Sequence, residues 1–503
     1  MTAMVSRDAL SPGRGVAYAA IAAASLAGFV LSNLAALNQN DFMYAVAPAV
    51  WAQNGALYTD VPFPQAPLSI LLNSLLVATT GDVNVFLLAR IVSMGLVLLA
   101  ILVPVLNRRK ARDFEIWVLY VSLCLTNYFV ISNSREIGNY ALSLLCLSAA
   151  VTIVGASGSV KWRGFAAFVF IGLATSAKLY FIIIFPALFL YFLINERKAR
   201  SPAVVVVFGA GLIVGLAPVL FFLARDYQAF WRWTIQFFQL IMPFRLTDAA
   251  DGLRRIADML LLFAALMAIP IGFFVAATWT AWRQGGVELR EKSAQLLLLA
   301  ATCAMAISPI ILFGQYFGPL AFLLLLFSAP WRPSGDQIRF RYKIFAGAML
   351  CLQAVIVVGI IGAGISRDGD LVVAEVLKTQ KAARQVVAGG YRCERKLYTT
   401  VPLFLLENDI KYPPELAAGP FLMIFLRGDL LVKKGLAFDI DPHIKKWDPD
   451  IVIWGYFLGS HDAAEDAVDR SIRDYAISHS FAVASLGKVD GHEIELGYRT
   501  GCR

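Results

Sequence analysis

Charged residues are scarce in this chain of 503 amino acids. Asp, Glu, Lys and Arg make up 16% of it, hydrophobic residues make up 59%, and the mean hydropathy is +0.67. Soluble domains contain about 25% charged residues, so this composition excludes a soluble globular protein. A net charge of +9 would suggest a nucleic-acid partner if it formed one patch. The basic residues are instead dispersed among short connectors between apolar runs, which excludes nucleic acid as a partner.

Histidine is scarce as well. The four histidines all lie after residue 440, at His443, His461, His479 and His492. The apolar part of the chain therefore cannot form a histidine-containing zinc site. A metal there would need carboxylate ligands, which suit Mg²⁺ or Mn²⁺, and no motif in the sequence requires one. We therefore expect no obligatory cofactor.

Charge density changes near residue 366. Residues 1–365 hold 26 basic and 15 acidic residues, whereas 366–503 hold 18 and 20. The first part has the composition of a membrane module and the second that of a globular domain. In the second part, helical stretches at 371–388 and 462–478 alternate with strand-like runs at 421–425, 451–454 and 481–484, which predicts a soluble α/β domain.

Apolar runs of membrane-spanning length recur through residues 1–365. A spanning helix needs about 20 apolar residues, because lipid offers no partners for backbone N–H and C=O groups. Hydropathy therefore predicts an α-helical polytopic membrane protein with about 11 transmembrane helices. The expected spans are 16–37, 83–106, 114–132, 138–155, 164–177, 179–194, 203–224, 257–281, 293–313, 317–330 and 344–365.

Basic residues in the short loops predict the orientation, because such loops stay mainly on the cytoplasmic side. The apolar run 67–79 is expected to be an interfacial helix that does not cross the membrane. With that assignment, 18 of the 26 basic residues of the membrane module fall on the same side of the membrane. The N-terminus is then cytoplasmic and 366–503 periplasmic, as in a multi-pass protein of a cell inner membrane. Cys393 and Cys502, the two cysteines of that exported part, are expected to form a disulfide, the alternative being two free thiols.

The remaining basic residues of the membrane module lie on the outer face. A cation at an apolar boundary is costly unless it is paired or reaches the headgroups, so several together indicate an anionic ligand such as a lipid phosphate. The alternative for each is that it reaches lipid headgroups. These residues are Arg90, Arg135, Lys178, Arg225, Arg232, Arg245, Arg254 and Arg255.

The first outer loop, 38–82, carries an acidic residue where the first span should end. A carboxylate at that boundary has the environment that a general base requires, so Asp41 is a candidate base; the alternative is a helix N-cap. Asp60 is a weaker acidic candidate, since it follows Tyr58-Thr59 in a Gly-centred turn and a turn role is favoured.

The order of motifs in this loop resembles the GT-C superfamily, polytopic glycosyltransferases that use polyprenyl-phosphate sugars and include protein O-mannosyltransferases and lipid A aminoarabinose transferases. The matching features are one span, then D-x-x-Y at Asp41 to Tyr44, G-x-L-Y-x-D at 55–60, a Pro-Leu helix, and Gly81 followed by Ala89-Arg90-Ile91. The motif match covers 41–91, and the topology match about 16–330.

The resemblance implies roles for individual residues. Asp41 matches the catalytic base, Lys178 the lysine that we assign to the donor phosphate, and Arg135 a recurrent outer-face arginine. Asn139 stands where relatives often have an aspartate, so a second acid or metal ligand would have to be Glu136 or Asp60. Arg225 and Arg90 complete the expected phosphate-binding set, and the substrate cavity is expected to include Tyr44, Tyr58, Gln315, Tyr316, Arg232 and Arg245.

A second large outer loop is expected at 225–256. Its aromatic residues alternate with arginines, a pattern that suits headgroup depth and could guide a polyprenyl chain. The alternative is that the loop is only a membrane anchor.

The sequence thus predicts a membrane glycosyltransferase with a polyprenyl-phosphate-linked sugar as donor and a glycan, lipid or protein as acceptor. One base plus cations predicts a single displacement with inversion. A transporter or flippase of lipid-linked sugars is the alternative, but such proteins commonly show repeats or paired broken helices, and the sequence shows neither. A membrane-anchored sensor or assembly protein would not need so many spans.

Overall fold

The computed structural model describes most of the chain. The described residues are 12–35, 39–80, 85–107, 114–135, 139–237, 289–308, 314–329, 336–365, 370–390, 395–399, 410–416, 440–455, 463–489 and 491–501, with some single residues and short pieces between 239 and 279 and Phe404. All structural statements below concern these residues.

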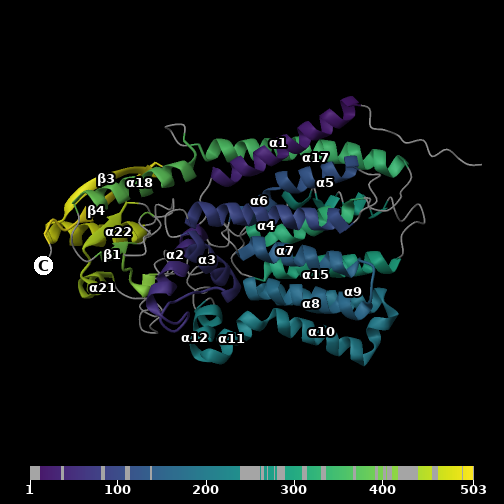
Figure 1. The fold of residues 1–503 in the computed structure, drawn as a ribbon. Helices are drawn as coiled ribbons and strands as arrows, with labels where there is room; N and C mark the ends of the chain where they lie inside the picture. Colours follow the sequence, from purple (N-terminus) through teal and green to yellow (C-terminus); the bar gives the residue numbers. More distant parts are fainter. Residues whose placement is uncertain are drawn as a thin grey trace, which may run out of the picture.

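Residues 12–363 form a helical bundle (Figure 1). Helix α8 packs between α7 and α10, α4 packs on α7, and α1 packs on both α5 and α17. Helix α16 contacts α6 and α15, and α15 contacts α9. The helices are α1 (Pro12–Leu34), α4 (Val85–Asn107), α5 (Phe114–Thr126), α6 (Tyr128–Arg135), α7 (Asn139–Val154), α8 (Val160–Ala177), α9 (Ile184–Asn195), α10 (Pro202–Gly215), α11 (Ala217–Arg225), α15 (Leu289–Ile307), α16 (Gly314–Ser328) and α17 (Asp336–Ala363).

The expected spans coincide with these helices, except 257–281, which lies largely outside the described residues. Within the described part, three helices are long and apolar enough to cross a membrane: Gly13–Leu34, Val85–Asn107 and Phe340–Ala363. The number rises to five if each of two bent helix pairs counts as one span, and other apolar helices are shorter. The fold is therefore mostly helical, and the expected number of eleven spans stays a prediction.

Two of the helices are broken, which the sequence did not lead us to expect. Helices α5 and α6 meet at an angle of 62°, as do α10 and α11. At the first break the side-chain oxygen of Asn127 accepts hydrogen bonds from the backbone N–H groups of Phe129 and Val130, at 3.1 and 3.3 Å. This oxygen replaces the carbonyl partners that the break removes. At the second break, Pro218 cannot donate a backbone hydrogen bond to the preceding turn.

Glycines bring α8 and α10 into backbone contact. A Cβ atom on Gly215 would lie 2.2 Å from the carbonyl oxygen of Val169, and one on Gly172 would lie 2.7 Å from the Cα of Gly215. A Cβ on Gly211 would lie 2.4 Å from the carbonyl oxygen of Phe165. Small residues at such an interface let two helices approach closely, which favours association in lipid.

The first loop contains two helices, α2 (Gln39–Asn54) and α3 (Pro67–Thr80), which pack on each other. Between them the chain turns at Gly55, whose φ of +98° is readily available only to glycine. The turn closes with the backbone N–H of Tyr58 donating to the carbonyl oxygen of Val61 at 2.9 Å. The run 67–79, which the sequence predicts to be a helix, is confirmed as a helix by α3.

Residues 370–501 contain helices and a small mixed sheet, where the sequence predicts an α/β domain. The strand order is β1-β2-β4-β3, with β1 and β2 parallel and the other pairs antiparallel. The predicted strand 421–425 lies outside the described residues. The elements are α18 (Val372–Gly390), β1 (Leu397–Thr399), the 3₁₀ turn η6 (Pro414–Leu416), α21 (Ile440–Trp447), β2 (Ile451–Trp454), α22 (Ala463–Ser478), β3 (Ala482–Val489) and β4 (His492–Tyr498).

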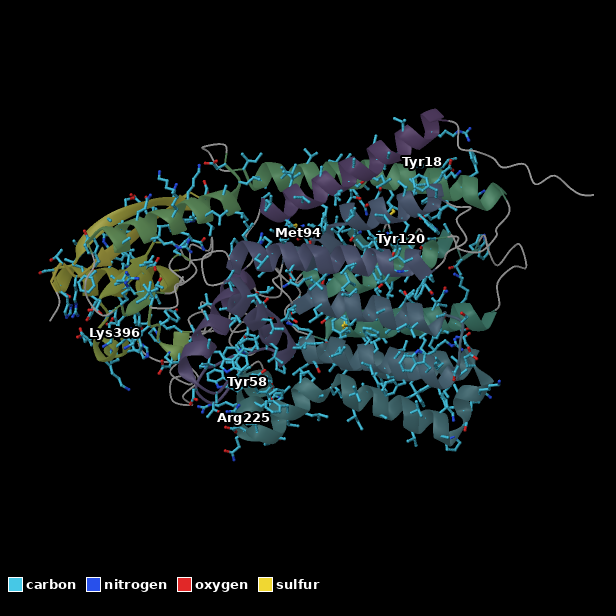
Figure 2. The ribbon with its side chains drawn as sticks, viewed as in Figure 1. Tyr18, Tyr58, Met94, Tyr120, Arg225 and Lys396 are labelled. Atoms are coloured by element: carbon cyan, nitrogen blue, oxygen red, sulfur yellow. The ribbon has the colours of Figure 1, made fainter. Side chains whose placement is uncertain are left out.

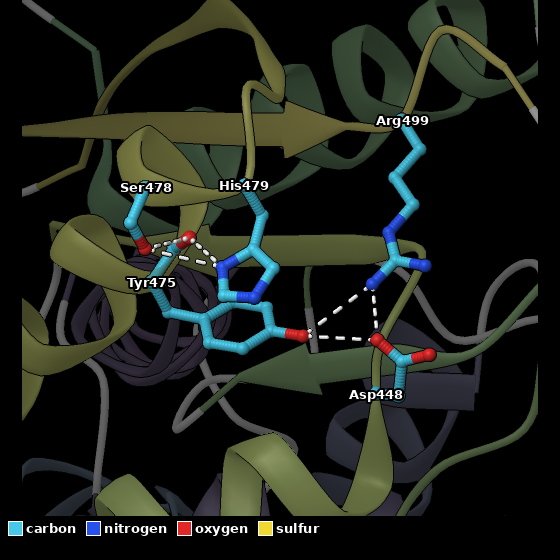
Figure 3. Close-up of polar contacts among 5 residues, drawn as sticks. All are labelled: Asp448, Tyr475, Ser478, His479 and Arg499. Carbon is cyan, nitrogen blue, oxygen red and sulfur yellow. Dashed lines mark hydrogen bonds and ion pairs between the residues drawn. The ribbon is translucent and has the colours of Figure 1, made fainter.

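A polar network holds α22 to the sheet (Figure 3). The hydroxyl of Tyr475 donates to Oδ1 of Asp448 at 3.1 Å, and Arg499, just after β4, forms an ion pair with the same carboxylate. The ring of Tyr475 stacks on His479 with centroids 4.0 Å apart. This network joins three segments that are distant in sequence.

One apolar core joins the first loop to the C-terminal sheet. Its buried side chains include Tyr44 and Phe63 from the loop, Phe230 from the segment after α11, and Tyr398 and Ile453 from the strands. Figure 1 shows α2 and α3 between the bundle and the sheet. The boundary predicted near residue 366 falls between α17 and α18, and the buried core continues across the parts on either side of it.

Candidate active site

Lys178 lies at the end of α8, where the chain leaves the helix. Its backbone is extended, with φ −149° and ψ 110°, and the next residues form the 3₁₀ turn η2 (Leu179–Ile183). The residue is only 5% exposed. A buried ammonium group needs compensating contacts, because burial removes its hydration.

Three tyrosine rings surround the Lys178 ammonium. Nζ lies 4.7 Å from the ring centroid of Tyr140, 5.8 Å from that of Tyr180 and 6.0 Å from that of Tyr316. Ring faces attract a cation at these distances, and each such contact contributes about 0.5–2 kcal/mol. Tyr316 also packs edge-to-face on both other rings. We call these three residues the tyrosine cage; they come from α7, η2 and α16.

Two amide side chains add hydrogen bonds to Lys178. Its Nζ donates to Oε1 of Gln65 at 2.8 Å. In the amide orientation that satisfies both ends of Asn139, its oxygen accepts from Lys178 Nζ at 3.2 Å and from the hydroxyl of Tyr44. Its nitrogen then donates to the carbonyl oxygen of Ala177 at 2.6 Å. Both amides are buried and uncharged.

The first loop is fixed around Gln65. The hydroxyl of Tyr58 donates to the backbone oxygen of Gln65 at 2.8 Å, and burial raises the pKa of Tyr58 well above its usual value. Asn73 of α3 donates to the backbone oxygen of Tyr44 at 3.1 Å. Asp41 is the third residue of α2, one turn before Tyr44. The helix thus begins ahead of Asp41, which differs from the N-cap alternative; the Asp41 side chain lies outside what the structure describes.

Two of the predicted cations contact the end of α1. Arg90, fully buried, donates to the backbone oxygen of Asn33, and Arg135 donates to that of Ser32 at 3.0 Å. Ser134 donates to the Asn33 side chain at 2.8 Å. A helix C-terminus has unpaired carbonyl groups and a partial negative charge, which guanidinium groups satisfy. These contacts hold the end of α1, seven residues before Asp41.

The segment after α11 meets the turn that carries Tyr58, as the labels of Tyr58 and Arg225 in Figure 2 show. Thr59 donates to Asp226 at 3.1 Å, and Asp226 caps helix α12 (Tyr227–Trp231) by accepting from the backbone N–H of Ala229. Arg225 is exposed at the end of α11.

The other expected site residues fall in three groups. Asp60 accepts from the backbone N–H of Ala56 at 2.7 Å, in agreement with the turn role. Gln315 is buried at the start of α16 beside Tyr316, and the guanidinium of Arg232 lies 5.9 Å from the Trp233 ring centroid. Outside the described residues lie Glu136, Arg245, Arg254, Arg255, Cys393 and Cys502.

Among the described residues, no group of three or more His, Cys, Asp or Glu side chains could hold a metal ion. Mg²⁺ or Mn²⁺ binding through Glu136 or Asp41 involves side chains that are not described.

Sequence reasoning missed Gln65, Tyr140 and Tyr180 as members of this site. Gln65 lies in the Pro-rich turn 62–67, Tyr140 follows Asn139 and Tyr180 follows Lys178 by two residues. Proximity to Lys178 and to the unusual Asn139 was the available signal for the two tyrosines.

No family model matches the chain, and no curated protein matches it in sequence. Among solved structures, it is similar to ArnT from Cupriavidus metallidurans bound to undecaprenyl phosphate, with a TM-score of 0.58 and 14% identity over 96% of this chain and 98% of that one. The apo crystal structure of that ArnT gives 0.56, with the same identity and coverage. An Archaeoglobus fulgidus oligosaccharyltransferase in complex with Zn and sulfate gives a TM-score of 0.45, with 12% identity over 85% of this chain and 67% of that one. The likeness to ArnT shows that this chain shares its fold, over nearly the whole length of both chains.

Proposed function

We propose that this chain is an integral-membrane glycosyltransferase that moves a sugar from a polyprenyl-phosphate donor to an acceptor on the periplasmic side of an inner membrane. The observation that carries the proposal is the buried Lys178 ammonium in its tyrosine cage, within a fold shared with a protein crystallised with undecaprenyl phosphate. A buried cation near a membrane boundary is suited to an anionic ligand.

The proposed chemistry needs a cation at the donor phosphate. Breaking the anomeric C–O bond leaves negative charge on the phosphate oxygens, and a preorganised ammonium group stabilises that charge most where water is excluded. We assign this role to Lys178. Arg225, Arg135 and Arg90 are further proposed phosphate contacts, and the bonds of the last two with α1 give them a structural task as well.

Asp41 is the proposed general base. It would take the proton from the acceptor hydroxyl as that oxygen attacks the anomeric carbon, which gives inversion in a single step. Its support is its position in α2, one turn before Tyr44, whose hydroxyl contacts Asn139 beside Lys178. Residues three apart in an α-helix share a face, so we propose that the Asp41 carboxylate lies on the side of α2 that carries Tyr44.

The remaining assignments follow from the sequence. The N-terminus is proposed to be cytoplasmic, and the C-terminal domain and first loop to bind a glycan, lipid or protein acceptor. The cavity is proposed to include Tyr58, Gln315 and Arg232 together with the cage. Transfer is proposed to need no obligatory cofactor.

The transporter alternative gains one observation. The breaks α5/α6 and α10/α11 are of the kind seen in transporters, whose discontinuous helices form binding sites. At the α5/α6 break, the side chain of Asn127 accepts hydrogen bonds from the freed backbone N–H groups. After the α10/α11 break, α11 leads directly into the segment that contacts the first loop. The two functions differ in whether the sugar is released from its carrier.

The experiment is sugar release from a panel of radiolabelled polyprenyl-phosphate sugars by membranes that contain the wild type or Asp41→Asn, with acceptor glycans and with or without EDTA. Loss of a general base lowers the rate about 10²–10⁴-fold. Asp370→Asn is the matched control, because Asp370 pairs with Lys378 on the surface of the C-terminal part. Release that is equal in wild type and Asp41→Asn would remove Asp41 from the mechanism. No release from any donor would favour the transporter.

A further inference from the structure

We propose that the 3₁₀ turn η3 (Arg197–Arg200) and the start of α10 form a binding surface for an anionic phospholipid. The lipid phosphate lies against the basic side chains of η3, and an acyl chain lies along the exposed side of α10. In the proposed orientation this surface belongs to the cytoplasmic leaflet. The inference goes beyond the proposed function, because binding of this lipid does not depend on sugar transfer.

Basic residues are concentrated in η3. Three of its four residues are basic, and the fourth, Ala199, is fully buried in the core of the bundle. The turn packs on α8, α9 and α10, and Lys198 and Arg200 are exposed. Arg200 donates from Nε to the backbone oxygen of Leu193 at 3.3 Å, an acceptor without net charge. The turn therefore presents positive charge at one fixed place on the surface.

Little acidic charge lies around this turn. The structure describes residues 139–237 without interruption, and this stretch contains two acidic residues, Glu196 and Asp226. Glu196 forms an ion pair with Arg163 near the start of α8. Asp226 caps α12, beyond the other end of α10. The part of the chain that packs around η3 therefore carries a net positive charge, which suits an anionic partner.

An exposed apolar stripe begins beside η3. Val206, near the start of α10, is 70% exposed, and Ile213 is 60% exposed. Residues seven apart share a face of a helix, so the stripe runs about 10 Å along α10 at 1.5 Å per residue. Helix α10 lies at the edge of the bundle, away from α1 and α17 (Figure 1). A basic turn next to an apolar stripe matches a phospholipid, which joins a charged headgroup to an acyl chain, whereas a soluble anion would leave the stripe uncovered.

An exposed tryptophan lies on the neighbouring helix. Trp162, near the start of α8, is 67% exposed, and its ring stacks on Phe165 with centroids 6.0 Å apart. Helix α8 packs along α10, and its start is joined to the residue before η3 by the Arg163–Glu196 ion pair. Tryptophan is enriched where lipid headgroups meet acyl chains. Trp162 therefore supports headgroup depth for this end of the two helices, and it provides a fluorescent reporter of the lipid beside them.

The test measures the lipid preference at Trp162. The full-length protein is reconstituted into phosphatidylcholine vesicles that contain increasing fractions of phosphatidylglycerol brominated on its acyl chains. A parallel series contains brominated phosphatidylcholine. Bromine quenches nearby tryptophan fluorescence, and subtracting the signal of Trp162→Phe leaves the quenching of Trp162 itself. The two series give the association constant of phosphatidylglycerol relative to phosphatidylcholine at this surface.

A basic residue near an anionic membrane surface contributes about 5-fold to association, so we expect a relative association constant of at least about 5 for the wild type. Lys198→Gln/Arg200→Gln should lower this constant to about 1, because the attraction is lost with the charges. Lys198→Gln alone keeps the contact between Arg200 and the backbone and should give an intermediate value. The matched control is Lys381→Gln/Arg473→Gln, which removes two exposed basic residues from α18 and α22 and should retain the wild-type value.

The unfolding temperature of each variant in phosphatidylcholine alone shows whether it is folded, and Lys198→Gln decides the test if the double variant is not. A wild-type constant close to 1 would overturn the inference. An unchanged constant in folded Lys198→Gln/Arg200→Gln would overturn it as well, because the preference would then come from other charges. Absence of Trp162 quenching by either lipid would show that another part of the chain covers the surface, which also overturns it. Each of these results leaves the proposed sugar transfer in place, since the measurement involves neither Lys178 nor a sugar donor.

Discussion

Replacing Lys178 with methionine tests the center of the proposed site. Methionine keeps the unbranched stem and removes the charge. A unit charge about 4 Å from a phosphate oxygen at an effective dielectric constant of about 20 contributes about 4 kcal/mol, and a charge-assisted hydrogen bond measured in proteins contributes about 1.5–3 kcal/mol. We therefore expect the Kd for undecaprenyl phosphate to rise between about 10-fold and about 1,000-fold.

The assay is ligand-dependent stabilisation of the full-length protein in detergent. A ligand at 100 times its Kd stabilises the native state by about 2.7 kcal/mol, and a 1,000-fold weaker ligand at the same concentration stabilises it by less than about 0.1 kcal/mol. The unliganded variant should also be less stable by about 1–3 kcal/mol, because Gln65 and Asn139 lose a buried hydrogen-bond donor. These two effects are measured separately, without and with ligand.

Lys161→Met is the matched control, since Lys161 is an exposed lysine near the other end of the same helix α8, about 25 Å away at 1.5 Å per residue. It should retain both the stability and the Kd of the wild type. A Lys178→Met protein with a Kd within 3-fold of the wild type would refute the assignment of Lys178 to the phosphate.

Other substitutions test the packing around the site. Gly215→Ala should lower the free energy of unfolding by about 1–3 kcal/mol, because the new Cβ would lie 2.2 Å from a backbone oxygen of α8. Chemical denaturation in detergent measures this change. Gly209→Ala is the control and should not be destabilised, because there is open space around its Cβ. Asp226→Ala should cost about 1 kcal/mol through loss of the α12 cap, with faster amide exchange in 227–231, and unchanged exchange would contradict the cap. The pKa of Glu415 is lowered, mainly by its contact with His443, whose Nε2 lies 3.7 Å from the carboxylate. This carboxylate therefore stabilises the fold above its unfolded pKa of about 4.3, and the contribution is lost as the pH falls through the lower folded value. Glu415→Gln should therefore lower the thermal unfolding temperature at pH 6 and not at pH 3, and equal shifts at both would show that charge is not involved.

The positions of the helices could be predicted from the sequence because the constraint is local. A chain in lipid must pair its own backbone groups, so apolar runs such as 83–106 and 138–155 become helices wherever they occur. The breaks at Asn127 and Pro218 were not predicted. The first depends on a side chain that replaces backbone partners, and nothing in the composition of 114–132 distinguishes that arrangement from a continuous helix.

The site was predictable in part for a similar reason. Lys178 stands out as a cation that interrupts an apolar run, whereas Tyr140 and Tyr180 look like ordinary aromatic residues at a membrane boundary. Their role depends on the convergence of α7, η2 and α16 on one point, which is a property of the tertiary packing. Gln65 is uncharged and lies in a turn, so only its contact with Lys178 reveals it.

The core shared by the first loop and the C-terminal sheet has a consequence for biogenesis. Tyr44 and Phe63 are made early, whereas Tyr398 and Ile453, which belong to the same core, are made more than 330 residues later. Because translation runs from the N-terminus, the apolar surface of the first loop is made long before the C-terminal sheet that buries it. A chain truncated before the sheet would keep the helical bundle and leave this apolar surface exposed.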